Sequence, residues 1–213
     1  MSKFADLRQE YKKHQLSEEN ILKDPLEQFR VWFHEALEVG VMEPNAFTLA
    51  TVSNNGTPSA RVLLLKGVDD NGFVFYTNYT SDKGRDLAEK PVGSMVFLWL
   101  ELERQVRISG PVTKVSREES EIYFHSRPRE SQIGAWVSPQ SQIISSREEL
   151  EKNLIVQQEN FKNSEIIPLP GYWGGYRLQP LQIEFWQGRP NRLHDRLLFS
   201  AIENSWKIER LAP

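Results

Sequence analysis

Short, mostly apolar runs along this chain predict most of its strands. Several short runs are rich in β-branched and aromatic side chains, and Asn-Gly turns separate the first three of them. Asn-Gly turns between β-rich runs are typical of β-hairpins. The expected strands are residues 47–52, 60–66, 73–77, 95–100, 105–112, 181–186 and 205–211. Because most connections are short and carry no helix, the pattern favours an antiparallel sheet or barrel.

Apolar residues at helical spacing, preceded by capping signals, predict the helices. The first helix starts at Asp24, where Pro25 takes the first helical position and Glu27 completes a capping box. Capping serines mark the start of the others. The expected ranges of these helices are 81–89, 116–124 and 146–161.

The remaining stretches indicate the domain organisation. Residues 1–23 are polar and charged, and we interpret them as a flexible N-terminal arm. Residues 132–141 are expected to form a polar loop around one tryptophan, and residues 172–176 a tight aromatic turn on the core. No linker or repeat divides the rest. Residues 24–213 should therefore form a single mainly β, barrel-like domain with peripheral α-helices.

Composition and charge narrow the possible functions. The chain has 213 residues, of which 39% are apolar and 26% charged, as in an ordinary soluble domain. A formal net charge of −3 does not favour nucleic-acid binding. The N-terminus lacks the apolar core of a signal peptide, and the longest apolar run, residues 95–100, is too short to cross a bilayer. A cytoplasmic protein with no nucleic-acid or membrane partner is expected.

The residue types also exclude several chemistries. There are no cysteines, which excludes disulfides, a thiolate nucleophile and cysteine-held zinc or iron–sulfur clusters. The four histidines are scattered without ligand spacing, so no metal site is expected. Any redox chemistry would need a borrowed cofactor.

Arginine and lysine cluster in several places, and the first three clusters have an ordinary explanation beside a functional one. Arg61 and Lys66 flank an apolar strand, where they could simply reach water. Segment 76–85 enters a helix at Ser81, and is either a phosphate cradle or an ordinary serine-capped helix. Segment 123–131 holds two arginines near a helix end, where cations are stabilising in any case. Guanidinium groups on a stiff turn also match phosphate.

The segment Glu184–Arg196, EFWQGRPNRLHDR, combines three arginines, a histidine and a tryptophan. On an extended backbone Arg192, His194 and Arg196 share one face, which is typical of a site that meets an anion. Asp195 is a candidate for orienting the histidine, as carboxylates often do. His125, in contrast, is interpreted as structural.

Taken together, these segments resemble the pyridoxine/pyridoxamine 5′-phosphate oxidase family. The motifs that carry the resemblance are RVLLLK, FYTN..S.K, LERQVRI.G, YFHSRPRESQIGAWVSPQS, YWGGYR, EFWQ, RLHDR and the ending WKIERLAP. They occur in the family's order and extend from about Leu7 to Pro213. The resemblance implies an FMN-binding split β-barrel, antiparallel and Greek-key-like, in a homodimer that binds FMN at the subunit interface.

The resemblance also implies a reaction and its site. Pyridoxine 5′-phosphate or pyridoxamine 5′-phosphate would be oxidised to pyridoxal 5′-phosphate, with O2 as acceptor and H2O2 as product. The implied FMN contacts are Arg61, Val62, Leu63, Leu64, Leu65, Lys66, Tyr76, Thr77, Lys83, Gln105, Gln140, Ser141, Trp186 and Arg196. The implied substrate contacts are Arg8, Tyr11, Lys66, Tyr123, Arg127, Ser131, Arg192 and His194. Arg192 and His194 would be the catalytic pair over the pyridine ring, and residues 8–11 a flap.

One position departs from the family pattern. The family commonly has Ser-Arg-Lys where this chain has Ser81-Asp82-Lys83. An acidic residue beside a phosphate site is unfavourable, so either Arg85 compensates it or Asp82 points to solvent.

Three other functions stay open. The chain could be another flavin-binding split barrel, such as a flavin reductase or F420-type oxidoreductase, but RPRES and RLHDR argue against it. It could be a non-catalytic carrier of pyridoxal phosphate, which would keep the arginines but show no turnover. It could be an RNA-binding β-barrel, which the negative net charge disfavours.

Overall fold

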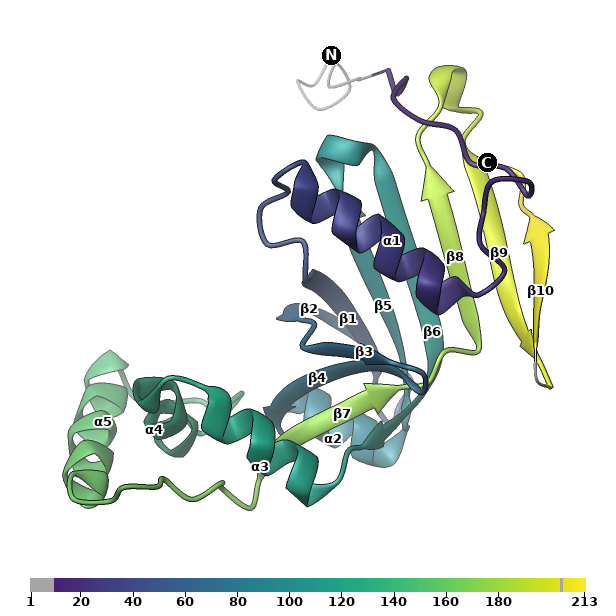
Figure 1. Cartoon of the computed structure of the whole chain (residues 1–213). Helices are drawn as coiled ribbons and strands as arrows, with labels where there is room; N and C mark the ends of the chain where they lie inside the picture. The colour runs from purple at the N-terminus through teal and green to yellow at the C-terminus, as the bar shows by residue number, and fades with distance from the viewer. Residues whose placement is uncertain (1–9, 204) are drawn as a thin grey trace, which may run out of the picture.

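The structure is a computed structural model that describes residues 10–203 and 205–213 (Figure 1). The strands in this part are β1 (Ala46–Val52), β2 (Pro58–Leu64), β3 (Gly67–Asp69), β4 (Gly72–Asn78), β5 (Val92–Trp99), β6 (Arg104–Lys114), β7 (Trp173–Leu178), β8 (Gln182–Gln187), β9 (Asp195–Ile202) and β10 (Ser205–Arg210). The helices are α1 (Pro25–Glu38), α2 (Asp82–Glu89), α3 (Arg117–Ser126), α4 (Arg129–Val137) and α5 (Arg147–Phe161). Across the described residues, no helix has the length and apolar character needed to cross a membrane.

Antiparallel pairing curls most of these strands into a barrel. Strand β1 pairs with β2 and β5, β5 pairs with β6, β6 with β7, and β7 with β4. Strand β4 pairs in turn with β3, which follows β2 after only Leu65 and Lys66. The N–H of Lys66 donates to the carbonyl of Val74 in β4 at 2.9 Å. The paired strands therefore run from β2 through β1, β5, β6, β7, β4 and β3, and return to the residues that follow β2.

The barrel is split along β6. Residues 104–109 of this strand pair with β8, whereas Val112–Lys114 pair with β7. Strands β8, β9 and β10 consequently extend beyond the barrel as an antiparallel wing (Figure 1). The fold is the mainly β, antiparallel split barrel with peripheral helices that the sequence resemblance implied.

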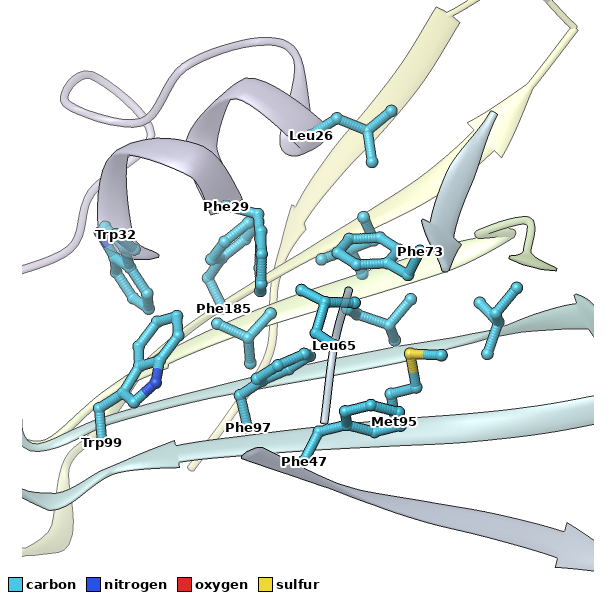
Figure 2. Packing of buried hydrophobic residues seen from close by; sticks show 14 of the residues in the cluster. Leu26, Phe29, Trp32, Phe47, Leu65, Phe73, Met95, Phe97, Trp99 and Phe185 are labelled. Carbon is cyan, nitrogen blue, oxygen red and sulfur yellow. The ribbon is translucent and has the colours of Figure 1, made fainter. Parts of the chain in front are cut away.

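Helix α1 packs its apolar face on the sheet. Its carboxylate cap, Asp24, accepts a hydrogen bond from the N–H of Leu26 at 2.8 Å, which satisfies one of the free donors of the first turn. Phe29 then meets Phe73 and Phe97 at ring-centroid distances of 4.9 and 5.0 Å (Figure 2). Burying each such side chain stabilises the fold by roughly 1.5–3 kcal/mol. Helix and barrel thus share one core.

A second, smaller core holds the helical end of the molecule together. Phe124, Ile133, Ile167, Leu169 and Trp173 are buried there against one another, where α3 and α4 meet β7. Helix α5 contributes no buried residue. Figure 1 shows α3, α4 and α5 gathered at the end of the molecule opposite the turn between β8 and β9.

Two predictions about local structure were wrong. Residues 172–176 were expected to be a turn, but β7 begins at Trp173, because Gly174 and Gly175 let aromatic rings of β4 and the turn after it pack on the strand backbone. Residues 132–141 were expected to be a loop, but α4 continues to Val137. Proline occupies the N-cap of α4, so the helix lacks the serine or aspartate that precedes the other α-helices in the sequence. Strands β3 and β9 had not been predicted at all.

The N-terminal segment lies against the domain from residue 10 onwards. Leu16 and Ile21 are buried and belong to the main core. The predicted arm, residues 1–23, is thus partly packed where it is described, while its first nine residues lie outside the described part of the chain. Its flexibility stays a prediction.

Candidate functional site

Lys83 is a buried cation in the first turn of α2. Its ammonium group donates to two uncharged oxygens, Ser81 Oγ at 3.3 Å and Gln140 Oε1 at 3.2 Å. Burial lowers the pKa of Lys83, and the nearby Arg61 guanidinium lowers it further. Burying a charge among neutral partners is costly, so an anion at this position would be strongly favoured.

Arg61 supplies a second cation from β2. Its Nη1 donates to Thr51 Oγ1 at 2.7 Å, and its Nη2 lies 4.0 Å from Asp86 Oδ2. Burial lowers the pKa of Arg61 in spite of the attraction of Asp86. Helix α2 also directs its N-terminal N–H groups to this region, since Ser81 is its N-cap. Two cations and a helix N-terminus fit a phosphate group.

Gln140 joins further predicted cofactor residues to this cradle. Its Oε1 accepts from Thr77 Oγ1 at 3.2 Å as well as from Lys83. Ser141 follows in an exposed position with φ of +69°, in the left-handed region. A non-glycine residue held in that conformation is often found at a functional site. The cradle thus gathers Arg61, Thr77, Lys83 and Gln140 from three parts of the sequence.

Asp82 carries its own counter-charge. Its carboxylate forms an ion pair with Arg85 one turn along α2, and both side chains are more than half exposed. Both explanations considered for this departure from the family pattern apply: Arg85 balances the charge of Asp82, and Asp82 also faces solvent. Ion pairing at this distance in sequence supports the helix as well.

A second group of predicted residues lies at the helical end. The rings of Tyr76 and Tyr123 stack at a centroid distance of 3.9 Å, and Trp173 is nearly parallel to both. The guanidinium of Arg127 lies 4.8 Å over the ring of Trp173, and its Nη2 donates to the carbonyl of Ser131 at 2.8 Å. Its Nη1 is buried and has no hydrogen-bond partner among the described residues, and burial lowers the pKa of Arg127. An unsatisfied buried guanidinium nitrogen is costly unless a ligand accepts from it.

A third group lies at the turn between β8 and β9. His194 packs on Trp186 at a centroid distance of 4.6 Å, and Tyr11 contacts both rings edge-on at 5.8 Å. The backbone N–H of Arg189 donates to His194 Nδ1 at 3.1 Å, which leaves the proton of the neutral ring on Nε2. Burial lowers the pKa of His194, and Arg192 adds to this. The imidazole is therefore neutral at pH 7.

The extended backbone assumed for this segment was wrong. Residues Pro190–Arg192 form a 3-10 turn, in which Asn191 and Arg192 have φ of 56° and 62°. Strand β9 begins only at Asp195. The alternation that was expected to place Arg192, His194 and Arg196 on one strand face does not apply, because the first of the three lies in a turn.

Arg196 and Asp195 also differ from their expected roles. Arg196 donates from Nε to Glu184 Oε1 at 2.7 Å and from Nη1 to the carbonyl of Ala212 at 2.8 Å, so its charge is matched within the chain. Glu184 is buried and raises the pKa of Arg196. Asp195 binds Leu16 rather than His194, through a 3.1 Å bond to the backbone N–H. The histidine takes its orientation from Arg189 instead.

Three of the other predicted cofactor residues share one face of the sheet. Gln105, Trp186 and Arg196 are direct cross-strand neighbours on β6, β8 and β9. Along β2 and the connection after it, Val62, Leu64 and Lys66 are exposed, Leu63 is half-buried and Leu65 is part of the core.

His125 Nε2 lies 3.0 Å from the carbonyl of Ile167, which agrees with its structural interpretation. Within residues 10–203 and 205–213, no three acidic or histidine side chains are grouped so as to hold a metal ion.

One copy of the chain does not bring all predicted site residues together. Tyr123, Arg127 and Ser131 lie on α3, α4 and the short connection between them. Arg192 and His194 lie at the β8–β9 turn, at the opposite end of the molecule (Figure 1). Tyr11 belongs with the second set through its ring contacts. Arg8 lies outside the described residues.

Sequence reasoning missed several residues that shape these groups. Trp173 forms the wall under Tyr123 and Arg127, and Arg189 orients the imidazole. Gly188 allows close approach, since a Cβ there would lie 2.6 Å from Tyr11 Cγ. Both Arg189 and Gly188 stand in the unusual arginine-rich segment, which was the available signal. Trp173 gave no such signal, because its contacts depend on the fold of α3.

Comparison with known families gives two matches that together cover most of the chain. A family model described as "Pyridoxamine 5′-phosphate oxidase" matches residues 33–155. A second model, described as "Pyridoxine 5′-phosphate oxidase C-terminal dimerisation region", matches residues 173–213.

Individual relatives agree with these matches. Curated proteins named pyridoxine/pyridoxamine 5′-phosphate oxidase are 55% identical in Salinibacter ruber, over the full length of both chains, and 49% identical in Cytophaga hutchinsonii, over 98% of both. Among solved structures, PhzG from Burkholderia lata, in complex with tetrahydrophenazine-1-carboxylic acid, is 31% identical with a TM-score of 0.87 and covers 93% of this chain and 98% of its own. A pyridoxamine 5′-phosphate oxidase-related, FMN-binding protein from Nostoc punctiforme shares the fold, with a TM-score of 0.68 at 19% identity over 87% of this chain and 97% of its own.

Proposed function

Since the chain belongs to the pyridoxamine 5′-phosphate oxidase family, we propose that it is an FMN-dependent oxidase that makes pyridoxal 5′-phosphate. Its substrates are pyridoxine 5′-phosphate and pyridoxamine 5′-phosphate. The alcohol loses two electrons and two protons to give the aldehyde, and O2 takes them up as H2O2. The amine loses the same electrons and protons, and water then releases ammonia from the imine.

The phosphate cradle at α2 is the observation that carries this proposal. Lys83 and Arg61 would hold the FMN phosphate, because a buried and a half-buried cation lie near one another and Lys83 has only uncharged hydrogen-bond partners among the described residues. Thr77 and Gln140 would complete the cradle with hydroxyl and amide groups. When bound, FMN supplies the electron acceptance that no side chain of this chain can provide. The protein's part is to bind, orient and exclude water.

The remaining proposed cofactor contacts surround the flavin ring. Gln105, Trp186 and Arg196 would meet it from neighbouring strands, since they lie side by side on β6, β8 and β9. The backbone from Arg61 to Lys66, together with Tyr76 and Ser141, would contribute the other contacts. Glu184 fixes the position of the Arg196 guanidinium and matches its charge, so Arg196 would not meet the flavin as a free cation.

The substrate phosphate would bind at the helical end. Arg127 lies over Trp173 with a buried Nη1 that has no partner in residues 10–203 and 205–213, and such a nitrogen gains a charge-assisted hydrogen bond to a phosphate oxygen. Tyr123 and Ser131 would add hydroxyl groups, and the exposed Lys66 a second cation. A phosphate-binding group at Arg127 favours the B6 phosphates over a ligand without a phosphate, such as the carboxylic acid bound by PhzG.

Arg192 and His194 would act on the ring of the substrate, with Tyr11 and Arg8 closing over it. His194 is neutral, accepts from Arg189 at Nδ1, and therefore has Nε2–H free to donate to a substrate oxygen. Arg192 would lie over the pyridine ring near the carbon that loses hydride and would donate to the oxygen or nitrogen atom bonded to that carbon. Such pre-oriented groups stabilise developing charge without reorganising.

A homodimer would unite the two halves of this site. The helical end and the β8–β9 turn lie apart in one copy (Figure 1), and a second copy could bring its turn to the helical end of the first. The match of residues 173–213 to a dimerisation region supports this assembly. FMN would then bind at the interface.

An absorbance spectrum of the purified protein tests the proposal first. We expect flavin bands that bleach when pyridoxine 5′-phosphate is added without air, and aldehyde plus peroxide when air is admitted. A yellow protein that ignores both B6 phosphates would indicate another flavin-dependent activity, as for PhzG. A colourless protein that takes up no added FMN would contradict the proposal and favour a carrier of pyridoxal phosphate.

A further inference from the structure

An ionic cluster fastens the N-terminal segment to the part of the molecule that carries His194. We propose that Arg210 is a positioning residue, which clamps residues 14–18 against β9 and thereby sets the place of Tyr11 and His194 at the substrate site. This inference rests on the proposed function for its kinetic consequences. Its structural part, the clamp, concerns only contacts within the chain.

Arg210, the last residue of β10, uses its whole guanidinium group in the clamp. Nε and Nη2 bind the two carboxylate oxygens of Glu18 at 2.9 and 2.7 Å, a bidentate pair. Nη1 binds Asp195 Oδ1 at 2.9 Å, and Nη2 also donates to the carbonyl of Leu16 at 3.3 Å. One side chain on β10 therefore contacts both the N-terminal segment and the start of β9.

Asp195 completes the clamp from β9. Its Oδ2 accepts from the backbone N–H of Leu16 at 3.1 Å and lies 3.5 Å from Arg189 Nε. Arg189 in turn donates from Nη1 to the carbonyl of His14 at 3.1 Å, and from its backbone N–H to His194 Nδ1 at 3.1 Å. The same arginine thus touches the N-terminal segment, the clamp and the imidazole.

The clamp lies next to the aromatic contact that it would set in place. Leu16 is buried between the clamp and the core, so the segment is fixed at that point. Five residues earlier, the Tyr11 ring lies edge-on to Trp186 and His194. Gly188 makes this close approach possible, since a Cβ there would be 2.6 Å from Tyr11 Cγ.

The strength of the clamp suits positioning rather than folding. Arg210 and Glu18 are about half exposed, and single pairs of that kind contribute little to stability. Three carboxylate contacts and one backbone contact on one guanidinium do fix its geometry. Loss of the clamp should therefore loosen residues 14–18 and leave the barrel intact.

The test uses Arg210→Ala, Glu18→Ala and the double variant in the full-length protein. Lys207→Ala is the matched control, because Lys207 lies on the same strand and pairs at 2.7 Å with Glu209, away from the clamp. We expect the KM for pyridoxine 5′-phosphate to rise about tenfold in both single variants, and little further in the double variant, because the two residues act as one unit. The kcat, the melting temperature and FMN affinity should change much less.

Limited proteolysis tests the clamp without reference to activity. Lys12 and Lys13 are exposed and precede the clamp, so trypsin should cut there about fivefold faster in Arg210→Ala and Glu18→Ala, but not in Lys207→Ala. Unchanged cleavage and unchanged KM would overturn the inference. Faster cleavage in a protein with no B6 phosphate turnover would retain the clamp and reject the proposed function. A fall in melting temperature large enough to account for the loss of activity would show that Arg210 has a structural role only.

Discussion

Lys83 offers a residue-scale prediction in which two forms of the protein respond in opposite ways. Replacing it with methionine removes a buried cation that has only neutral hydrogen-bond partners in the described structure, so the cofactor-free protein should become equally or more stable. The same change should weaken FMN binding by about 2 kcal/mol, roughly thirtyfold, through loss of a charge-assisted bond to phosphate. Thermal unfolding with and without FMN, together with flavin titration, measures both effects.

The control for this pair of measurements is Lys152→Met, on the exposed face of α5. It should change neither the unfolding temperature nor the affinity for FMN. If Lys83→Met destabilised the cofactor-free protein and left FMN affinity intact, the lysine would be a structural residue and the phosphate cradle would have to lie elsewhere.

His194 leads to a prediction about pH. Its pKa is lowered from the ordinary 6.5, first by burial and then by Arg192, so the ring gains a proton only at a pH below that value. Protonation would remove the Nδ1 acceptor of the Arg189 N–H and add a like charge beside Arg192. We therefore expect kcat/KM to be maintained at neutral pH and to fall as the pH decreases through a value below 6.5.

The titration of the His194 ring, followed by NMR, should coincide with this acidic limb. His34→Gln is the control, since that histidine is exposed on α1 and should leave the profile unchanged. An acidic limb that persisted in His194→Gln, or a ring that titrated above 6.5, would contradict the assignment.

At the scale of elements, β7 depends on its two glycines. A Cβ at Gly175 would lie 2.6 Å from Val115 Cγ2 and 2.7 Å from Tyr76 Cε1. Gly175→Ala should therefore overpack this region and cost about 1–3 kcal/mol of unfolding free energy. It should also displace Tyr76 from its stack with Tyr123. Denaturant unfolding measures the first effect, and Gly171→Ala, which would meet nothing within 4 Å, is the control.

The same strand shows what the sequence could and could not predict. Helices with a capping serine or aspartate, and strands in short β-rich runs bounded by turn residues, were predicted because their signals are local. Strand β7 was not, since its glycines make sense only beside the rings of Tyr76 and Tyr79, which lie about a hundred residues earlier. The 3-10 turn at Arg192 was missed for a related reason, because nothing local announces its positive φ.

The candidate site was predicted in its parts but not in its arrangement. Clustered arginines and a capped helix start indicated the cradle at Lys83, and the motif resemblance identified the residues of the other two groups. Their separation in one copy could not be read from the sequence, because it depends on how β6 divides the sheet between β7 and β8.

At the scale of the whole molecule, the separation of α3 and α4 from the β8–β9 turn decides how many chains build one site. If a homodimer forms each site from both copies, Arg127 and Arg192 of the same site belong to different copies. A variant of either residue alone then inactivates both sites of its homodimer. A mixed dimer of the two variants keeps one site with both arginines intact and has one site that lacks both.

Mixing Arg127→Ala and Arg192→Ala chains therefore gives a quantitative prediction. Random pairing makes half of all dimers mixed, and half of the sites in these are intact, so co-expressed variants should regain about a quarter of the wild-type kcat per chain. Each variant alone should be nearly inactive, and mixing them after folding without exchange of subunits should restore nothing. The measurement is turnover of pyridoxine 5′-phosphate by the purified mixture, with the oligomeric state checked by sedimentation. A mixed dimer with no recovered activity would contradict a site that is built from both copies.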